Sequence, residues 1–204
     1  MMTNQLIQTL FETPKIIGLV GDANEGKSNL IYYLIGELNK HSVNIYAYGL
    51  RSYSHPNIKE VYSIQEIEQI SNSVIIVDEM FSLFDLENRK VRVQIEKTIR
   101  LIFHNNNVLF LCGLGENFKK FISAKLHYIL FKKVTFADLI NGSKVKNVIY
   151  NYNGAEKGSS ILNLKPEQAI FYDGLHYEKI IIPYLQKYDL KAKNVPILVQ
   201  KKVQ

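Results

Sequence analysis

The residues Gly21–Ser28, with the sequence GDANEGKS, constrain this chain more than any other stretch. They match the pattern G-x-x-x-x-G-K-[ST], a glycine-rich loop that joins a strand to a helix. An apolar run at 15–20 precedes the loop, and apolar residues recur at helical spacing after it. We therefore expect a buried strand before the loop and a helix from about Lys27 to Lys40. This order of elements predicts an α/β fold.

The loop carries the groups that hold a triphosphate. Glycines let successive backbone N–H groups converge on phosphate oxygens, and the helix N-terminus adds partial positive charge. Lys27 adds a full positive charge, and the Ser28 hydroxyl can complete the ligand shell of Mg²⁺. The sequence thus predicts a site for ATP and Mg²⁺, formed by Gly21, Asp22, Ala23, Asn24, Glu25, Gly26, Lys27, Ser28 and Asn29.

A second motif is the run Val74–Glu79, with the sequence VIIVDE. Four branched apolar residues in a row predict a central strand that is buried on both faces. The two acids follow at its carboxyl end, where open α/β sheets bind their ligands. In a P-loop protein Asp78 would hold the magnesium, directly or through water, and Glu79 would orient and deprotonate the attacking water. Because the second acid suits hydrolysis, we predict an ATPase in which Lys27 and Glu79 are catalytic.

The rest of the chain alternates between strand and helix patterns. We expect strands at 43–48, 108–112, 128–131 and 148–152, a hairpin of 169–172 and 177–182 around Asp173–Gly174, and helical segments at 3–11, 64–70, 87–104, 116–123 and 135–141. This alternation predicts a mostly parallel sheet covered by helices on both faces. We assign one domain to residues 1–204, with an N-terminal helix within 1–14, an ATPase core at 15–183 and a tail at 184–204.

Charge is spread unevenly along the chain. The formal net charge is +6. Residues 1–100 hold 10 basic and 12 acidic residues, a net of −2, whereas residues 101–204 hold 15 and 7, a net of +8. The basic second half fits either a bound polyanion or a solvated lysine-rich surface, and charge alone does not separate them.

Membrane segments and metal-binding cysteines are not expected. No apolar stretch approaches the roughly 20 residues that cross a bilayer, and the first residues lack the pattern of a signal peptide, so we expect a protein that is not secreted. The single cysteine, Cys112, ends an apolar run and is interpreted as a buried structural thiol. A zinc site is not predicted, because the histidines are scattered and no Cys-x-x-Cys is present.

Together, Gly21–Ser28 and Val74–Glu79 resemble the motifs of the additional-strand, catalytic-glutamate division of P-loop ATPases. The elements that follow, down to the closing segment Ile170–Pro183, are similar to the layout of the HerA/FtsK superfamily of DNA motors. Within it, the chain resembles the compact genome-packaging ATPases of tailless, membrane-containing icosahedral viruses. The resemblance covers about Lys15 to Pro183.

The resemblance implies a ring, usually a hexamer, with ATP between subunits and an arginine finger that reaches the neighbour's triphosphate. Arg100 is the preferred finger because it lies near the end of the helix before the strand at 108–112, and Arg89 and Arg92 remain alternatives. Members of this superfamily commonly have an arginine just before the strand that corresponds to 108–112, where this chain has His104 and an asparagine run. A polar sensor is also absent from the end of that strand, and Asn117 is either a γ-phosphate sensor or a helix cap.

The favoured hypothesis is a motor that moves double-stranded DNA into a capsid, gripping the phosphate backbone without reading sequence. Its grip would come from lysines such as Lys119, Lys120, Lys125, Lys144 and Lys146. Its expected partners are double-stranded DNA, further copies of itself, and capsid or membrane-vertex proteins, in the host cytoplasm or at the virion packaging vertex. Two alternatives stay open: a helicase, helicase loader or coupling ATPase that acts on single-stranded DNA, and a nucleotide-gated assembly protein with slow turnover.

Overall fold

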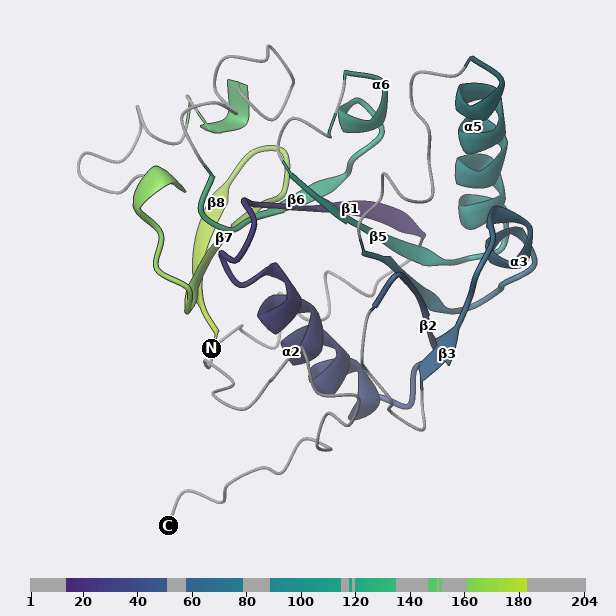
Figure 1. Cartoon of the computed structure of the whole chain (residues 1–204), viewed down its shortest axis with the longest axis horizontal. Helices are drawn as coiled ribbons and strands as arrows, with labels where there is room; N and C mark the ends of the chain where they lie inside the picture. The colour runs from purple at the N-terminus through teal and green to yellow at the C-terminus, as the bar shows by residue number, and fades with distance from the viewer. Residues whose placement is uncertain are drawn as a thin grey trace.

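A computed structural model describes residues 14–50, 58–78, 89–114, 118, 120–134, 147–149, 151 and 161–182. These residues form an eight-stranded sheet in the order β3-β2-β4-β5-β1-β6-β7-β8, with helices packed on it (Figure 1). The strands are β1 (Lys15–Val20), β2 (Ile45–Tyr48), β3 (Ile58–Glu60), β4 (Val74–Val77), β5 (Val108–Gly113), β6 (Tyr128–Phe131), β7 (Gln168–Tyr172) and β8 (Tyr177–Ile181). The helices are α2 (Lys27–Asn39), α3 (Ile64–Glu68), α5 (Arg89–His104), α6 (Lys120–Ser123) and the 3-10 helix η2 (Ile161–Asn163).

Strand order fixes which loops meet at the edge of the sheet. β1 lies between β5 and β6 and is parallel to both, so that Leu19 is opposite Cys112 on one side and Leu130 on the other. β5 also pairs in parallel with β4, and β4 with β2. One strand therefore separates β1 from β4, as expected for the additional-strand type of P-loop fold. β7 and β8 are antiparallel and form the predicted C-terminal hairpin.

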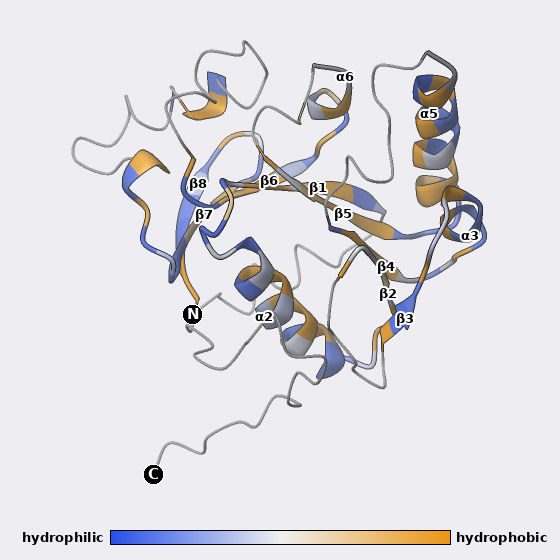
Figure 2. Cartoon of the chain, in the orientation of Figure 1, coloured by the Kyte–Doolittle hydropathy of each residue, from blue (hydrophilic) through white to orange (hydrophobic). Residues whose placement is uncertain are grey.

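The core has two layers, one on each face of the sheet. Ile16 and Val20 of β1 join a cluster that also holds residues of α3, α5 and α6, whereas Ile17 and Leu19 join the cluster under α2. This division follows from the twofold alternation of side chains along a strand. Figure 2 shows the result as mostly hydrophobic central strands between helices that mix hydrophobic and hydrophilic residues. The prediction of helices on both faces is confirmed.

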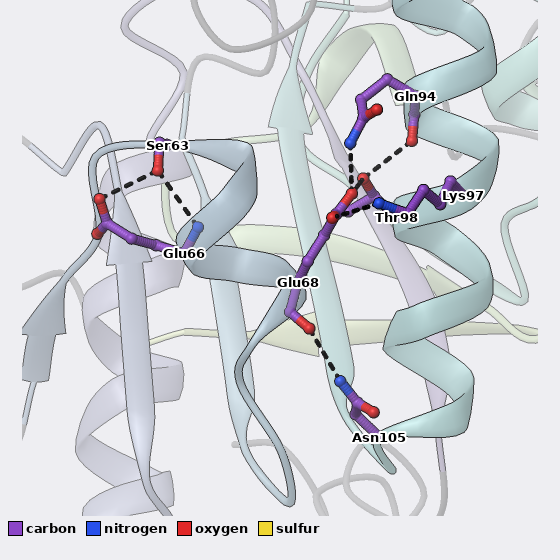
Figure 3. A network of polar contacts seen from close by, with 7 residues as sticks. All are labelled: Ser63, Glu66, Glu68, Gln94, Lys97, Thr98 and Asn105. Carbon is purple, nitrogen blue, oxygen red and sulfur yellow. Dashed lines mark hydrogen bonds and ion pairs between the residues drawn. The ribbon is translucent and has the colours of Figure 1, made fainter.

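A carboxylate on α3 fixes the position of α5. Glu68 accepts hydrogen bonds from the Gln94 amide (2.5 Å), the Thr98 hydroxyl (2.9 Å) and the Lys97 ammonium (3.0 Å), all on α5 (Figure 3). Burial raises the pKa of Glu68, but the hydrogen bonds and the charge of Lys97 outweigh it and lower the pKa. The Asn105 amide donates to the Glu68 carbonyl at 3.0 Å. The asparagine that follows α5 therefore links the end of this helix to the end of α3.

One predicted strand is wrong. Residues 147–149 and 151 are helical, although the sequence predicted a strand at 148–152. Val148 and Ile149 are both buried in the same core cluster, which adjacent residues of a strand would not share because their side chains point to opposite faces. The Val148 carbonyl also accepts a hydrogen bond from the Tyr177 hydroxyl (3.1 Å). Tertiary packing thus overrides the β propensity of this segment.

The other predicted elements agree with the structure where it describes them. The helix expected to end near Lys40 ends at Asn39, and the one expected from residue 87 is described from Arg89. The edge strand β3 was not predicted. The expected helices at 3–11 and 135–141 lie outside the described residues. Among the helices of the described part, none is long and apolar enough to cross a membrane.

Candidate nucleotide site

The predicted phosphate loop joins β1 to α2. All six residues of β1 are buried, so the strand holds the start of the loop rigidly. Within the loop Asn24 and Gly26 have positive φ values of 64° and 85°, which turn successive N–H groups toward one side. Gly26 is also the N-cap of α2, and it has no side chain to bond the helix's first N–H groups. These groups and the partial positive charge at the helix start are suited to an anion.

Lys27 closes over the loop. Its ammonium donates to the Gly21 carbonyl (2.7 Å) and to the Asp22 carbonyl (2.6 Å). The loop is tied to both neighbouring strands as well, because the Gly21 N–H donates to the Gly113 carbonyl (3.3 Å) and the Asp22 N–H to the Lys133 carbonyl (2.9 Å). The lysine of the motif is thus held against the backbone that would surround the phosphates.

Asp78 follows β4 at the same edge of the sheet. Its N–H donates to the Tyr48 carbonyl at 2.9 Å, which fixes its backbone to the end of β2. Gly49 packs directly against it: a Cβ added to Gly49 would lie 2.6 Å from the Asp78 carbonyl oxygen. Asp78 itself is half-buried. Its neighbours therefore leave its backbone little freedom.

Cys112 lies between the two motifs. This residue lies on β5, between β1 and β4, and is fully buried with a free thiol. Burial raises the pKa of the thiol well above its usual value, the charge of Asp78 raises it further, and the charge of Lys27 opposes both. The strand that carries Cys112 therefore separates the phosphate loop, which follows β1, from Asp78, which follows β4. The prediction of a buried cysteine is confirmed.

The donor set fits a magnesium ion. Within the described ranges, no group of three or more His, Cys, Asp or Glu side chains gathers that could hold a metal by itself. Nucleotide-bound Mg²⁺, however, takes most of its ligands from phosphates and water and needs only one or two protein oxygens. The hydroxyl of Ser28, in the first turn of α2, and the carboxylate of Asp78 are oxygen donors of the required kind.

Comparison with known proteins gives structural matches only. No family model matches the sequence, and neither does any curated protein. Among solved structures, the chain is similar to the genome packaging NTPase B204 from Sulfolobus turreted icosahedral virus 2 in complex with sulfate, with 17% identity, a TM-score of 0.62, and coverage of 82% of this chain and 96% of that one. The complex of B204 with ATPγS matches with 19% identity, a TM-score of 0.60, and coverage of 82% and 97%.

The fold is that of a P-loop NTPase. The chain is also similar to EssC (ATPases 2 and 3) from Geobacillus thermodenitrificans, with 16% identity and a TM-score of 0.58. This match covers 85% of this chain but 37% of that one. The chain thus spans nearly the whole length of the B204 chains and only part of EssC. Sequence identities this low show a similar fold and not a shared activity.

Three predicted site residues are not brought to the loop by the described structure. Glu79 and Asn117 lie outside the described residues. Arg100 is exposed on α5, one turn before the helix ends and β5 begins. Since β5 starts at the sheet edge opposite the phosphate loop, Arg100 lies far from the loop of its own chain. Glu96 lies one helical turn before Arg100, but within the described part no ion pair joins the two side chains.

Two lysines that sequence reasoning missed lie against the P-loop. Lys132 and Lys133 directly follow β6, the neighbour of β1. Lys132 is completely buried, and Lys133 forms an ion pair with Glu25 of the loop at 3.0 Å. A buried apolar strand that ends in two lysines was a visible signal, but only the strand order places this end beside the loop.

Proposed function

We propose that this chain is an ATP-hydrolysing motor that translocates DNA, and more specifically a viral genome-packaging ATPase that pumps double-stranded DNA into a capsid. The observation that carries the proposal is the placement of the phosphate loop after β1 and of Asp78 after β4, at the same edge of the sheet and on either side of β5, in a P-loop NTPase fold. The finer assignment rests on size. B204 is described as a genome packaging NTPase, and the match spans 96% of its chain, leaving little room for additional domains there.

Each group of the site would have a separate task. The N–H groups of 21–28 and the Lys27 ammonium would bind the phosphates and stabilise the charge that develops on the transferred phosphoryl group. Ser28 and Asp78 would hold Mg²⁺, which adds positive charge beside the phosphates when it is bound. Glu79, next in sequence to Asp78, would orient the attacking water and accept its proton. Asn117 would sense the γ-phosphate.

Arg100 would act in a neighbouring subunit. Because it lies at the edge of the sheet opposite its own P-loop, it could reach a triphosphate only across an interface between two copies. This favours a ring of identical subunits, which we propose to be a hexamer, with ATP at each interface and DNA in the centre. Capsid or membrane-vertex proteins would anchor the ring at the packaging vertex or in the host cytoplasm.

The test is ATP hydrolysis by the purified chain with and without duplex DNA at low salt. We expect duplex DNA of any sequence to stimulate turnover, and the stimulation to fall as salt rises. Glu79→Gln should lower kcat by at least about a hundredfold while ATP still binds, as expected when a general base is removed. The control is Glu178→Gln, which removes a carboxylate on β8 and should leave turnover unchanged.

Two outcomes would contradict the proposal. Hydrolysis that no DNA stimulates, combined with full function of the Glu79→Gln variant, would indicate a nucleotide-gated assembly protein. Stimulation by single-stranded DNA alone would indicate a coupling ATPase or helicase. A conjugation coupling protein, TcpA of pCW3, has a similar fold, with a TM-score of 0.55 and 12% identity. That match covers 82% of this chain and 60% of the TcpA chain. Electron microscopy with duplex DNA and a non-hydrolysable ATP analogue would give the number of subunits.

A further inference from the structure

The chain after β6 contacts the phosphate loop through backbone and side chains. The Lys132 N–H donates to the Val20 carbonyl at 2.7 Å, and the Lys133 carbonyl accepts from the Asp22 N–H at 2.9 Å. These bonds continue the β1–β6 pairing beyond the strands and into the loop. The backbone of both lysines is therefore hydrogen-bonded to the segment where β1 leads into the phosphate loop.

The side chain of Lys132 lies beneath the loop. A Cβ added to Gly21 would lie 2.6 Å from the Lys132 Cβ, and one added to Gly26 would lie 3.4 Å from its Nζ. Both glycines of the G-x-x-x-x-G-K pattern thus pack on one buried side chain. The Lys132 ammonium donates to the carbonyls of Pro166 and Gln168, which lead into β7.

This lysine is an unusual occupant of a buried position. Its relative exposure is 0%, and burial lowers its pKa to about 8, although the charges of Glu167 and Glu25 oppose that shift. An apolar residue would fill the same space without the desolvation cost of an ammonium. The ammonium instead links the loop to the segment before β7 by two hydrogen bonds.

The loop also has a charge that does not suit its ligand. Residues 21–28 include the acids Asp22 and Glu25 but only one base, Lys27, so their side chains sum to −1 when all are ionised. A triphosphate is strongly anionic, and the two acidic side chains oppose the attraction of the loop's N–H groups and of Lys27. Lys133 pairs with Glu25 at 3.0 Å, and Lys132 lies close enough to Glu25 to feel its charge. With both lysines the sum becomes +1.

We infer that Lys132 and Lys133 are a support for the P-loop on which triphosphate binding depends. Lys132 is a positioning residue that holds Gly21 and Gly26 over the segment before β7, and Lys133 neutralises Glu25 beside the phosphates. This inference rests on the proposed function, since it concerns the same nucleotide site. It adds two residues, from a different strand, to those of the motif itself.

A charge-cycle experiment tests the role of Lys133. Affinity for a fluorescent ATP analogue is measured for the wild type and for the variants Lys133→Met, Glu25→Gln and the double variant, with Lys179→Met on the exposed surface of β8 as the control. Lys133→Met should weaken binding about tenfold, the order expected from one uncompensated charge near a phosphate. Because the double variant lacks both charges, it should bind within about threefold of the wild type. A double variant as weak as Lys133→Met would overturn the assignment.

Hydrogen exchange without nucleotide tests the role of Lys132. In Lys132→Met the amides of 21–27 should exchange faster than in the wild type, and affinity for the ATP analogue should fall, while Lys132→Arg restores part of both. Unchanged exchange together with unchanged affinity would overturn the inference and leave the proposed function intact. A wild type that binds the analogue but neither hydrolyses ATP nor responds to DNA would instead overturn the proposed function alone.

Discussion

Gly49 offers a direct test of how the structure holds Asp78. This glycine follows β2, has a φ of 75°, and lies against the Asp78 backbone. In Gly49→Ala the new Cβ would lie 2.6 Å from the Asp78 carbonyl oxygen, whereas real Cβ atoms essentially never come closer than 3.0 Å. Asp78 and the end of β2 would therefore have to move apart by about 0.4 Å or more.

The magnitude has two parts. An alanine at positive φ costs about 1–2 kcal/mol. Overpacking against a backbone atom adds about 1–3 kcal/mol, because neither partner is the free end of a flexible side chain. We expect Gly49→Ala to lower the free energy of unfolding by about 2–5 kcal/mol. Because the displaced residue is a proposed magnesium ligand, ATP hydrolysis should also fall, by about tenfold or more.

Gly174→Ala is the matched control. Gly174 lies in the β7–β8 turn with a φ of 105°, and an added Cβ would meet no atom within 4 Å. This variant shares the backbone strain but not the clash, and it is far from Asp78 along the sheet. Urea unfolding should therefore show the smaller loss, and turnover should stay at the wild-type level.

The comparison of these two variants can refute the reasoning. Equal losses of unfolding free energy would mean that the contact between Gly49 and Asp78 is not tight. A Gly49→Ala variant that is destabilised but hydrolyses ATP normally at saturating Mg²⁺ would mean that the position of Asp78 does not matter for the chemistry. The first result would contradict the contact between Gly49 and Asp78, and the second would remove Asp78 from the proposed magnesium site.

Glu68 and Lys132 each give a prediction about stability and pH. In Glu68→Gln we expect a loss of about 1–2 kcal/mol at pH 7, because a charged acceptor of three hydrogen bonds is removed. The folded state lowers the pKa of Glu68, so this loss should shrink as pH falls below the ordinary value of 4.5, and urea titrations that show no such convergence would contradict it. For Lys132 the folded pKa of about 8 lies below the ordinary 10.5, so the unfolded chain binds more protons between these values. The free energy of unfolding of the wild type should therefore rise relative to that of Lys132→Met from pH 8 to pH 10, by at most about 1.4 kcal/mol per pH unit. Parallel pH profiles of the two proteins would refute the lowered pKa of Lys132.

Local signals in the sequence were sufficient for several elements. The glycine pattern at 21–28 fixed the order of β1, loop and α2, because the motif requires a strand before it and a helix after it. The branched run at 74–77 identified β4, since four such residues bury both faces. The turn at Asp173 was also local: its carboxylate accepts from the N–H groups of Leu175 (2.8 Å) and His176 (2.7 Å).

Other features depended on partners distant in sequence. Residues 148–149 have high β propensity but are helical, because both side chains enter one core cluster. The short edge strand β3 depends on its pairing with β2 more than on its own three residues. The two lysines after β6 were visible in the sequence, but the Lys132 ammonium bonds to residues distant along the chain, including Pro166, which is 34 residues away.

The sequence by itself determined the local elements: a glycine-rich loop, an acidic residue at a strand end, and the α/β alternation that brings such motifs to one edge of a sheet. Tertiary structure decided the strand order, and with it the position of β5 between the two motifs and of Lys132 and Lys133 beneath the loop. The physical reason is the distance along the chain over which each kind of interaction acts. Hydrogen bonding and side-chain periodicity within a segment are encoded locally, whereas the register between strands is a property of the whole core.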